Sequence, residues 1–189
     1  MVMQEGQPNG KAPEALHELG KFASEQIGIS VMLTGRSIDS IYVASKRDNR
    51  KDPIFNLFFP KFDKDISLNS EVALLNNIFL PNSLNKTFVE QEEMVKEFSK
   101  KIGKEMPGFK AIIGKVADYV DLRNVLNNMA KKLFEVGQFT RTVDETSDHN
   151  KVVVGNAMYG NFTVSRLNSN IGFDGVGVIP LIVPASLKV

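Results

Sequence analysis

Two amphipathic helical patterns occupy the centre of the chain, residues 85–137, and a break at Pro107-Gly108 separates them. The first pattern begins at a capping box, in which the Thr87 hydroxyl and the Glu90 carboxylate each bind a free backbone N–H. The second pattern starts near Phe109 and repeats apolar residues every three or four positions, which predicts another long helix. The first predicted helix has one buried stripe, formed by Phe88, Val95, Phe98 and Ile102.

The residues before this centre combine helical and extended patterns. Pro13 and Gly28 bound a helical pattern, because proline suits the first turn of a helix and glycine its C-terminal cap. The β-branched run at 29–34 predicts a strand, whereas 38–44 fits either a returning strand or a short helix. A capping serine and apolar residues at helical spacing predict a further helix over 71–79. The apolar face of the N-terminal helix is formed by Leu16, Leu19, Phe22, Ala23 and Ile27.

From Gln138 onward the pattern changes to the two-residue alternation of β-strands. Strands are predicted over 139–143, 151–154 and 161–166, with polar turns between them. The apolar tail at 171–189 contains three glycines and two prolines. That composition favours irregular, bulged or edge strands over a paired central strand.

Together these patterns predict a single α+β domain, in which the helical centre packs against a mainly antiparallel sheet formed largely by the C-terminal third. A flexible N-terminal arm is predicted at 1–12, followed by one domain at 13–189. Within that domain, 13–62 holds a helix and strands, 70–137 is helical and 138–189 is β-rich. Because strands and helices do not alternate regularly, the order argues against a doubly wound nucleotide-binding fold.

The composition of the chain excludes several kinds of chemistry, whereas it says little about the fold. The chain of 189 residues has 23 Lys+Arg against 22 Asp+Glu, so its net charge of +1 gives no general attraction to nucleic acid or anionic membranes. It contains no cysteine, which excludes disulfides, thiolate metal sites and thiol nucleophiles in this sequence. The first residues lack the apolar run of a secretory signal, and no apolar stretch approaches the roughly 20 residues of a membrane span. We therefore expect a cytoplasmic protein without a membrane span.

Several short stretches approach catalytic motifs but fail on spacing. In 108–116 the glycines are one residue too far apart for a phosphate-binding loop, and valine stands where the metal-binding hydroxyl belongs. The stretch 35–39 lacks the last glycine of a nucleophile elbow. His17 is expected on the polar side of its helix and His149 in a polar turn, so neither predicts a catalytic base. We expect no catalytic residue, no cofactor and a non-enzymatic protein.

Carboxylates gather at two places, at Asp63 with Asp65 and in the turn at 144–150. The turn offers oxygens at alternate positions, but it lacks the glycine and the distal glutamate of a calcium-binding loop. We interpret both groups as solvated turn residues and predict no metal site. An enzyme that uses Asp63, Asp65, Asp144 and Asp148 is the least favoured function.

The most distinctive local feature is a basic segment followed directly by an aromatic one, within residues 46–62. Basic side chains bind phosphates and aromatic rings stack on bases, so this order suits a surface for single-stranded nucleic acid. Two other interpretations stay open: the phenylalanines belong to the core, or they form an exposed apolar patch that marks a partner interface. The residues expected to bind nucleic acid are Lys46, Arg47, Arg50, Lys51, Phe58 and Phe59.

Two apolar segments, Ile54–Phe62 and Ile171–Val183, are the predicted contact surfaces for protein partners. In an assembly, the tail would extend a neighbour's sheet as an edge strand. The leading hypothesis is a non-enzymatic structural or adaptor subunit of a larger assembly, whose partners are other subunits or further copies of this chain. The alternative is a single-stranded nucleic-acid-binding subunit that uses segment 46–62. The residues expected to contact protein partners are Phe55, Phe58, Phe59, Phe62, Val178, Leu181 and Val183.

Overall fold

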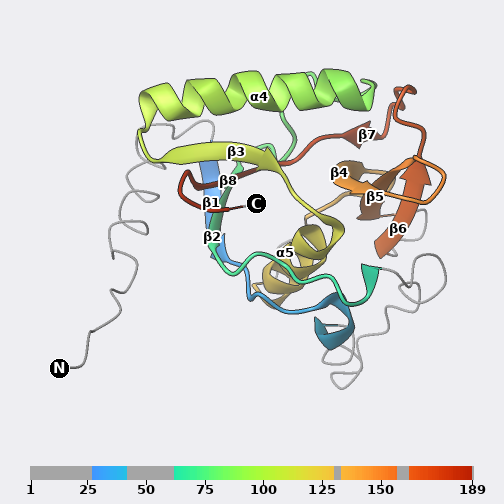
Figure 1. Ribbon diagram of the computed structural model, residues 1–189, viewed down its shortest axis with the longest axis horizontal. Coiled ribbons are helices and arrows are strands. Elements are labelled where there is room, and N and C mark those ends of the chain that lie inside the picture. The colour runs from blue at the N-terminus through green and yellow to red at the C-terminus, as the bar shows by residue number, and fades with distance from the viewer. Residues whose placement is uncertain (1–26, 42–61, 130–132, 157–161, 189) are drawn as a thin grey trace.

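The computed structural model describes residues 27–41, 62–129, 133–156 and 162–188. These residues form a single α+β domain with two four-stranded sheets and two long helices, α4 and α5 (Figure 1). The first sheet has the strand order β1-β2-β8-β3, and the second has β6-β5-β4-β7. No helix in this part of the chain is long and apolar enough to cross a bilayer. The elements are β1 (Ile27–Met32), β2 (Glu71–Leu75), α4 (Phe88–Glu105), β3 (Phe109–Ile113), α5 (Val116–Asn128), β4 (Phe139–Glu145), β5 (Lys151–Asn156), β6 (Phe162–Leu167), β7 (Val176–Gly177) and β8 (Pro180–Pro184).

The first sheet is covered on both faces, and its strand β2 is therefore apolar almost throughout. Val72 and Leu74 pack in a core shared with α5 and the second sheet, whereas Ala73 and Leu75 pack in a core beneath α4. A strand that buries both faces has a continuous apolar sequence and lacks the two-residue signature of a half-buried strand. The helix predicted over 71–79 is therefore wrong, because its first five residues form a central strand.

The N-terminal elements are short. The strand predicted at 29–34 is confirmed as β1. Of the segment 38–44, residues 38–41 form a short helix, and residues 42–44 lie outside the described residues. β1 already begins at Ile27, with a bulge between Ile27 and Ile29. Ile27 and Gly28 therefore belong to a strand, and the prediction of a helix that extends to Gly28 is wrong at these two residues.

Gly28 is required by close contact with a neighbouring strand rather than as a helix cap. A Cβ atom at this position would lie 2.3 Å from Oδ1 of Asn76, which follows β2. Only glycine leaves room for such an approach. The remaining residues of the predicted N-terminal helix, 13–26, lie outside the described residues.

The segment that follows α4 is a strand and a shorter helix, not the one long helix predicted from Phe109 onward. Phe109–Ile113 alternates buried and half-buried residues as β3, and α5 begins only at Val116. Gly114 separates the two elements, and a Cβ there would lie 2.7 Å from Leu181 Cδ1 on β8. A short apolar run fits a helix face and a buried strand equally well in sequence, and pairing with β8 decides for the strand.

The C-terminal tail contains a paired central strand, so the prediction of edge strands is wrong for β8. β8 lies between β2 and β3, and its pairs with β3 run from Phe109–Pro184 to Ile113–Pro180. Both prolines therefore lie at the ends of the strand, where the missing N–H removes no bond from the middle of the ladder. The side chains between the prolines are 0% exposed.

The strand pattern predicted after Gln138 is confirmed by the second sheet. β4, β5 and β6 pair antiparallel in chain order, and the short strand β7 pairs parallel to β4. α5 lies between the two sheets in Figure 1, and its apolar residues belong to the same core as Val152 and Val154 of β5. One core therefore joins both sheets, as a single domain requires.

Two buried aspartates on α5 fix loops of the first sheet to this helix. Asp121 accepts hydrogen bonds from the backbone N–H of Thr34 at 2.6 Å and from the Ser67 hydroxyl at 2.7 Å. Asp118 accepts one from the backbone N–H of Leu68 at 2.8 Å. Buried carboxylates with such partners are structural anchors.

Burial raises the pKa of Asp118 above its ordinary value of 3.8, although N–H donors from Lys115 and Leu68 act in the opposite direction. The folded protein then keeps a proton at a pH where the unfolded chain has lost it. Stability should therefore fall as the pH rises from 3.8 through the folded pKa. Asp118→Asn is expected to flatten this part of the curve, which urea unfolding across the acidic range would measure. An unchanged slope in the variant would contradict this assignment.

Candidate functional site

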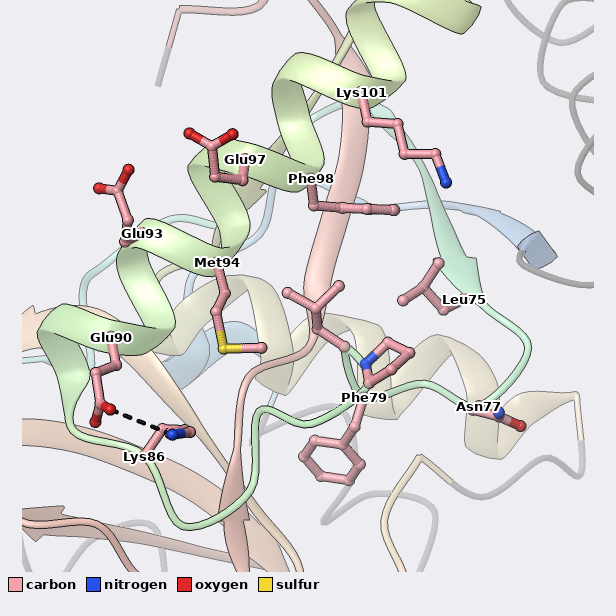
Figure 2. A pocket seen from close by; sticks show the side chains of 12 residues that line it. Leu75, Asn77, Phe79, Lys86, Glu90, Glu93, Met94, Glu97, Phe98 and Lys101 are labelled. Atoms are coloured by element: carbon pink, nitrogen blue, oxygen red, sulfur yellow. Dashed lines mark hydrogen bonds and ion pairs between the residues drawn. The ribbon is translucent and has the colours of Figure 1, made fainter.

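A groove of about 730 Å³ runs along one side of α4 and has an apolar floor (Figure 2). Met94 and Phe98 point from α4 toward Phe79 and Leu75, which belong to the end of β2 and the loop after it. One wall of the groove therefore consists of the end of β2 and the loop after it, and the other wall consists of α4, the next element of the chain. The apolar lining residues are Leu75, Phe79, Leu80, Pro81, Met94 and Phe98.

The apolar floor is accessible to solvent. Phe79, Met94 and Phe98 are half-buried, and Pro81 is exposed. Phe98 is a departure from the predicted buried stripe of α4, whose other members are buried. It lies on the groove side of the helix, so the protein leaves a large aromatic side chain partly open to water.

Charged side chains form the rim of the groove, and they carry three negative charges against two positive ones. The Lys86 ammonium lies 3.3 Å from the Glu90 carboxylate. The carboxylates of Glu93 and Glu97 point away from the floor (Figure 2), and Lys101 lies at the end of the groove nearest Leu75. The groove therefore has an apolar base, and its α4 edge carries Glu90, Glu93 and Glu97, of which Glu97 also pairs with Lys100 at 2.5 Å.

The capping box predicted at the start of α4 is confirmed, and it fixes the rim residue Glu90. The backbone N–H of Thr87 donates to the Glu90 carboxylate at 2.8 Å, and the N–H of Glu90 donates to the Thr87 hydroxyl at 3.3 Å. The hydrogen bond from the Thr87 backbone lowers the pKa of Glu90. Glu90 therefore stays ionised while it caps the helix.

The loop wall is tied to the core through Gln91, a completely buried polar residue of α4. Its amide nitrogen donates to the carbonyl oxygens of Ser83 at 2.8 Å and Val176 at 3.2 Å. The Ser83 hydroxyl in turn accepts from the N–H of Val178 at 3.1 Å, and Leu80 donates to the carbonyl of Val178 at 2.9 Å. These bonds tie the loop wall of the groove to α4 and to the segment 176–178.

The same loop contains three residues other than glycine with positive φ: Ile78 at 60°, Asn82 at 63° and Asn85 at 57°. Asparagine tolerates the left-handed region, but a β-branched residue there is strained by about 1–3 kcal/mol. Ile78 packs partly against the core, which offsets this strain. The wall of the groove therefore has a backbone conformation that tertiary contacts impose.

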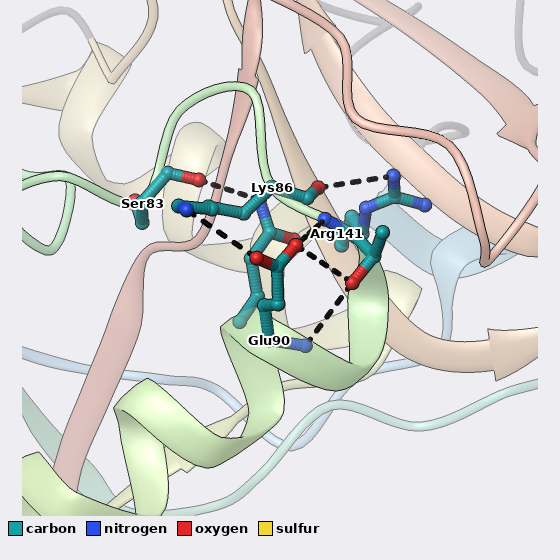
Figure 3. Close-up of polar contacts among 6 residues, drawn as sticks. Ser83, Lys86, Glu90 and Arg141 are labelled. Atoms are coloured by element: carbon teal, nitrogen blue, oxygen red, sulfur yellow. Dashed lines mark hydrogen bonds and ion pairs between the residues drawn. The ribbon is translucent and has the colours of Figure 1, made fainter.

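A buried arginine of the second sheet lies beside the loop and contacts its backbone at Lys86 (Figure 3). Arg141 is 0% exposed, and its guanidinium donates to the backbone carbonyls of Asn168 at 3.2 Å, Lys86 at 3.5 Å and Ile171. Desolvation lowers the pKa of Arg141. One side chain thus links β4 to the end of the groove where α4 begins.

Most of the residues that the sequence predicted as a site lie outside the described part of the chain. Of the predicted partner contacts that are described, Phe62 is 6% exposed, and Val178, Leu181 and Val183 are 0% exposed. These four side chains pack in the core, so the folded monomer does not offer them to a partner. The residues outside the described part, for which the nucleic-acid and interface hypotheses stay predictions, are Lys46, Arg47, Arg50, Lys51, Phe55, Phe58 and Phe59.

The glycine and lysine before α5 do not form a phosphate site. The backbone N–H of Lys115 donates to Asp118 at 2.7 Å, and that of Val116 donates to Asp144 at 2.6 Å. A phosphate at this helix end would need those donors, and two carboxylates already bind them. Within the described ranges, no three His, Asp or Glu residues gather as a set of metal ligands.

Comparisons of the chain with models of known protein families, with curated proteins and with solved structures found no match. The role of the groove is therefore inferred from its own geometry. The sequence signal for it was weak: Met94 and Phe98 lie beside the buried stripe of α4 and widen its apolar surface. The loop that completes the groove has no recognisable pattern of its own.

Proposed function

We propose that the protein is a non-enzymatic adaptor subunit of a protein assembly, and that the groove along α4 binds an amphipathic helix of a partner protein. The observation that supports this proposal is an accessible apolar floor between fixed walls in an otherwise well-packed monomer. Exposed apolar surface of this kind marks interaction sites in soluble proteins.

The dimensions of the groove suit a helix. Its α4 wall extends from Glu90 to Lys101, and eleven residue steps of a helix correspond to about 17 Å, or three turns. A partner helix would place apolar residues at positions i, i+3, i+4 and i+7 on the floor, as helices in grooves do. On the α4 edge Glu97 pairs with Lys100 at 2.5 Å, so Glu93 is the carboxylate that favours lysine or arginine on the flank of that partner.

Preorganisation supports the same conclusion. Gln91, Ser83 and Arg141 hold the loop wall through hydrogen bonds to the backbone of distant segments. A groove that is already open does not have to order its own loops when a ligand binds, and this reduces the entropic cost of association. The site can therefore bind a short helix without rearranging the sheet.

The groove should select basic amphipathic helices from a displayed peptide library, and Met94→Glu should weaken their binding about tenfold or more. The reason is that the new carboxylate lies in the apolar floor, where a bound helix would desolvate it. Fluorescence anisotropy with the selected peptides would measure the dissociation constants.

Gly103→Glu provides a matched control, because it adds the same charge to α4 at an exposed position that does not line the groove. A Cβ at this glycine has no neighbour closer than 3.8 Å, so the substitution fits. We expect peptide binding to be unchanged in this variant. Selection of no helical peptide, or equal loss in both variants, would refute the proposed function.

A further inference from the structure

We propose that the groove binds its partner helix in one direction, antiparallel to α4, and that Glu93 and Lys101 set this direction. The inference rests on the proposed function, because it specifies the partner of the same site. It predicts the charge pattern of that partner. The partner helix should carry a carboxylate in its first turn and a lysine or arginine about two turns later on the same flank.

Two of the rim carboxylates are already paired within the protein. Glu90 lies 3.3 Å from the Lys86 ammonium and also belongs to the capping box of α4. Glu97 lies 2.5 Å from the Lys100 ammonium. The hydrogen bond and the charge of Glu97 raise the pKa of Lys100, whereas Glu93 contributes less. These local pairs weaken the attraction of Glu90 and Glu97 for a ligand.

The remaining rim charges have opposite signs at the two ends of the groove. Glu93 is exposed and forms no ion pair of 4.0 Å or less within the described part of the chain. The side chain of Lys101 is 53% exposed, and its ammonium lies 3.9 Å from Glu105, which is a loose contact. Eight helical steps separate Glu93 from Lys101, or about 12 Å. The rim is therefore negative toward the start of α4 and positive toward its end.

The usual charge pattern of a helix fits this rim in only one direction. Carboxylates in the first turn and basic groups in the last turn stabilise a helix through its macrodipole. α4 follows this rule, with Glu90 in its first turn and Lys104 in its last. A partner that follows the rule brings its first turn to Lys101 and its last turn to Glu93 only if it runs antiparallel to α4. In the parallel direction, each end would meet a rim charge of its own sign.

The dipole of α4 favours the same direction, because antiparallel neighbours place ends of opposite charge side by side. The partner's own dipole acts against it, since its negative end approaches Glu93 and its positive end approaches Lys101. Each end of a helix carries only about half an elementary charge, whereas the side chains in those turns carry whole charges. The side-chain pairs therefore decide the direction.

Polar groups at both ends of the groove suit an antiparallel helix as well. The first N–H groups and the last C=O groups of any helix lack partners inside the helix. The Lys86 ammonium lies where the partner would end, and it has donors beyond the one that reaches Glu90. Asn77 is exposed and lies near Leu75 at the other end (Figure 2), where its amide oxygen can accept from the first N–H groups.

Two synthetic peptides of about three turns test the direction through their affinity. Both keep the apolar residues of the peptides selected on the groove and have blocked termini. The forward peptide has glutamate in its first turn and lysine in its last, and the reversed peptide has these charges exchanged. The wild-type protein should bind the forward peptide about tenfold more tightly, and Glu93→Lys with Lys101→Glu should invert this preference. Use of the same two peptides on both proteins cancels any difference in their helicity.

The double variant Glu92→Lys with Lys104→Glu is the matched control. It makes the same exchange of charge on α4, at residues that do not line the groove, so the preference should stay as in the wild type. If Glu93→Lys with Lys101→Glu also leaves the preference unchanged, the inference is overturned, although the peptides still bind and the proposed function stands.

Photo-cross-linking to the wild-type chain locates the ends of the bound peptide directly. A benzophenone side chain at the C-terminus of the forward peptide should react within residues 86–94, and one at its N-terminus within 75–77 or 98–101. Mass spectrometry of the digested product would map both sites. A reversed or mixed pattern would overturn the direction while binding remains. If no helical peptide binds at all, the proposed function fails and this inference falls with it.

Discussion

Replacing Asp121 with alanine is expected to lower the free energy of unfolding by about 3 kcal/mol, because two half-buried donors of Thr34 and the buried Ser67 hydroxyl lose their acceptor at once. The carboxylate accepts from the backbone N–H of Thr34 at 2.6 Å, from the Thr34 hydroxyl at 2.8 Å and from the Ser67 hydroxyl at 2.7 Å. Asp121 itself is 0% exposed. The loops that contain Thr34 and Ser67 would keep their hydrogen-bond donors but lose the carboxylate that accepts from both loops.

Urea and thermal unfolding would measure this loss, and about 3 kcal/mol corresponds to a fall of roughly 6–12 °C in Tm for a chain of this size. Asp121→Asn keeps one carbonyl oxygen as an acceptor, so it should cost about half as much. Asp174→Ala removes an exposed carboxylate and should change stability by less than about 0.5 kcal/mol. A loss in Asp121→Ala as small as that of Asp174→Ala would show that the bonds contribute no net stability.

The elements that local sequence specifies could be predicted. The capping box at Thr87 and Glu90 fixes the start of α4 through bonds that span three residues. The strands after Gln138 show their alternation because β4 and β6 each have partly exposed positions. In both cases the pattern and the structure depend on neighbouring residues.

The elements that were wrong depend on contacts between distant residues. β2 and β8 are buried on both faces of the first sheet, so neither has an alternating sequence, and one resembled a helix and the other an edge strand. β3 pairs with β8, about seventy residues later, and this pairing replaces the helix that its apolar run suggested. Pairing with a distant strand outweighs the local helix propensity of these residues, because their apolar side chains are buried only when the strands pair.

The groove could not be predicted for the same reason. Its wall is held by Gln91, whose amide donates to Val176 at a distance of 85 positions in the chain, and by Arg141, which binds Lys86 55 positions away. Sequence patterns identified the apolar surface of α4, but the position of the facing loop follows from these long-range hydrogen bonds. The sequence favoured the segment Ile54–Phe62 as a contact surface because its many phenylalanines stand out in the composition. The groove has no such signal, because it arises only when α4 and the loop face each other in the fold.

Arg141 is the residue whose loss should affect the fold and the groove together. Its guanidinium is completely buried, and the acceptors recorded for it are backbone carbonyls of Lys86, Asn168 and Ile171. Exchanging a buried ion pair for hydrophobic residues often leaves a protein equally stable or makes it more stable. That recovery is not expected here, because an apolar side chain would leave the three backbone carbonyls without a donor. Lysine has a single ammonium and cannot reproduce the planar fork that reaches three carbonyls.

Arg141→Met, which keeps much of the side-chain volume, should therefore lower the free energy of unfolding by about 3–5 kcal/mol, and Arg141→Lys should fall between it and the wild type. Arg166→Met, on β6 of the same sheet, removes an exposed arginine that pairs with Asp148 and should change stability by less than about 1 kcal/mol. Because Arg141 holds the carbonyl of Lys86, hydrogen exchange should also rise in the loop at 82–87 in Arg141→Lys under conditions where the protein stays folded. Unchanged exchange there, with stability lost, would mean that Arg141 supports the second sheet alone and does not shape the groove.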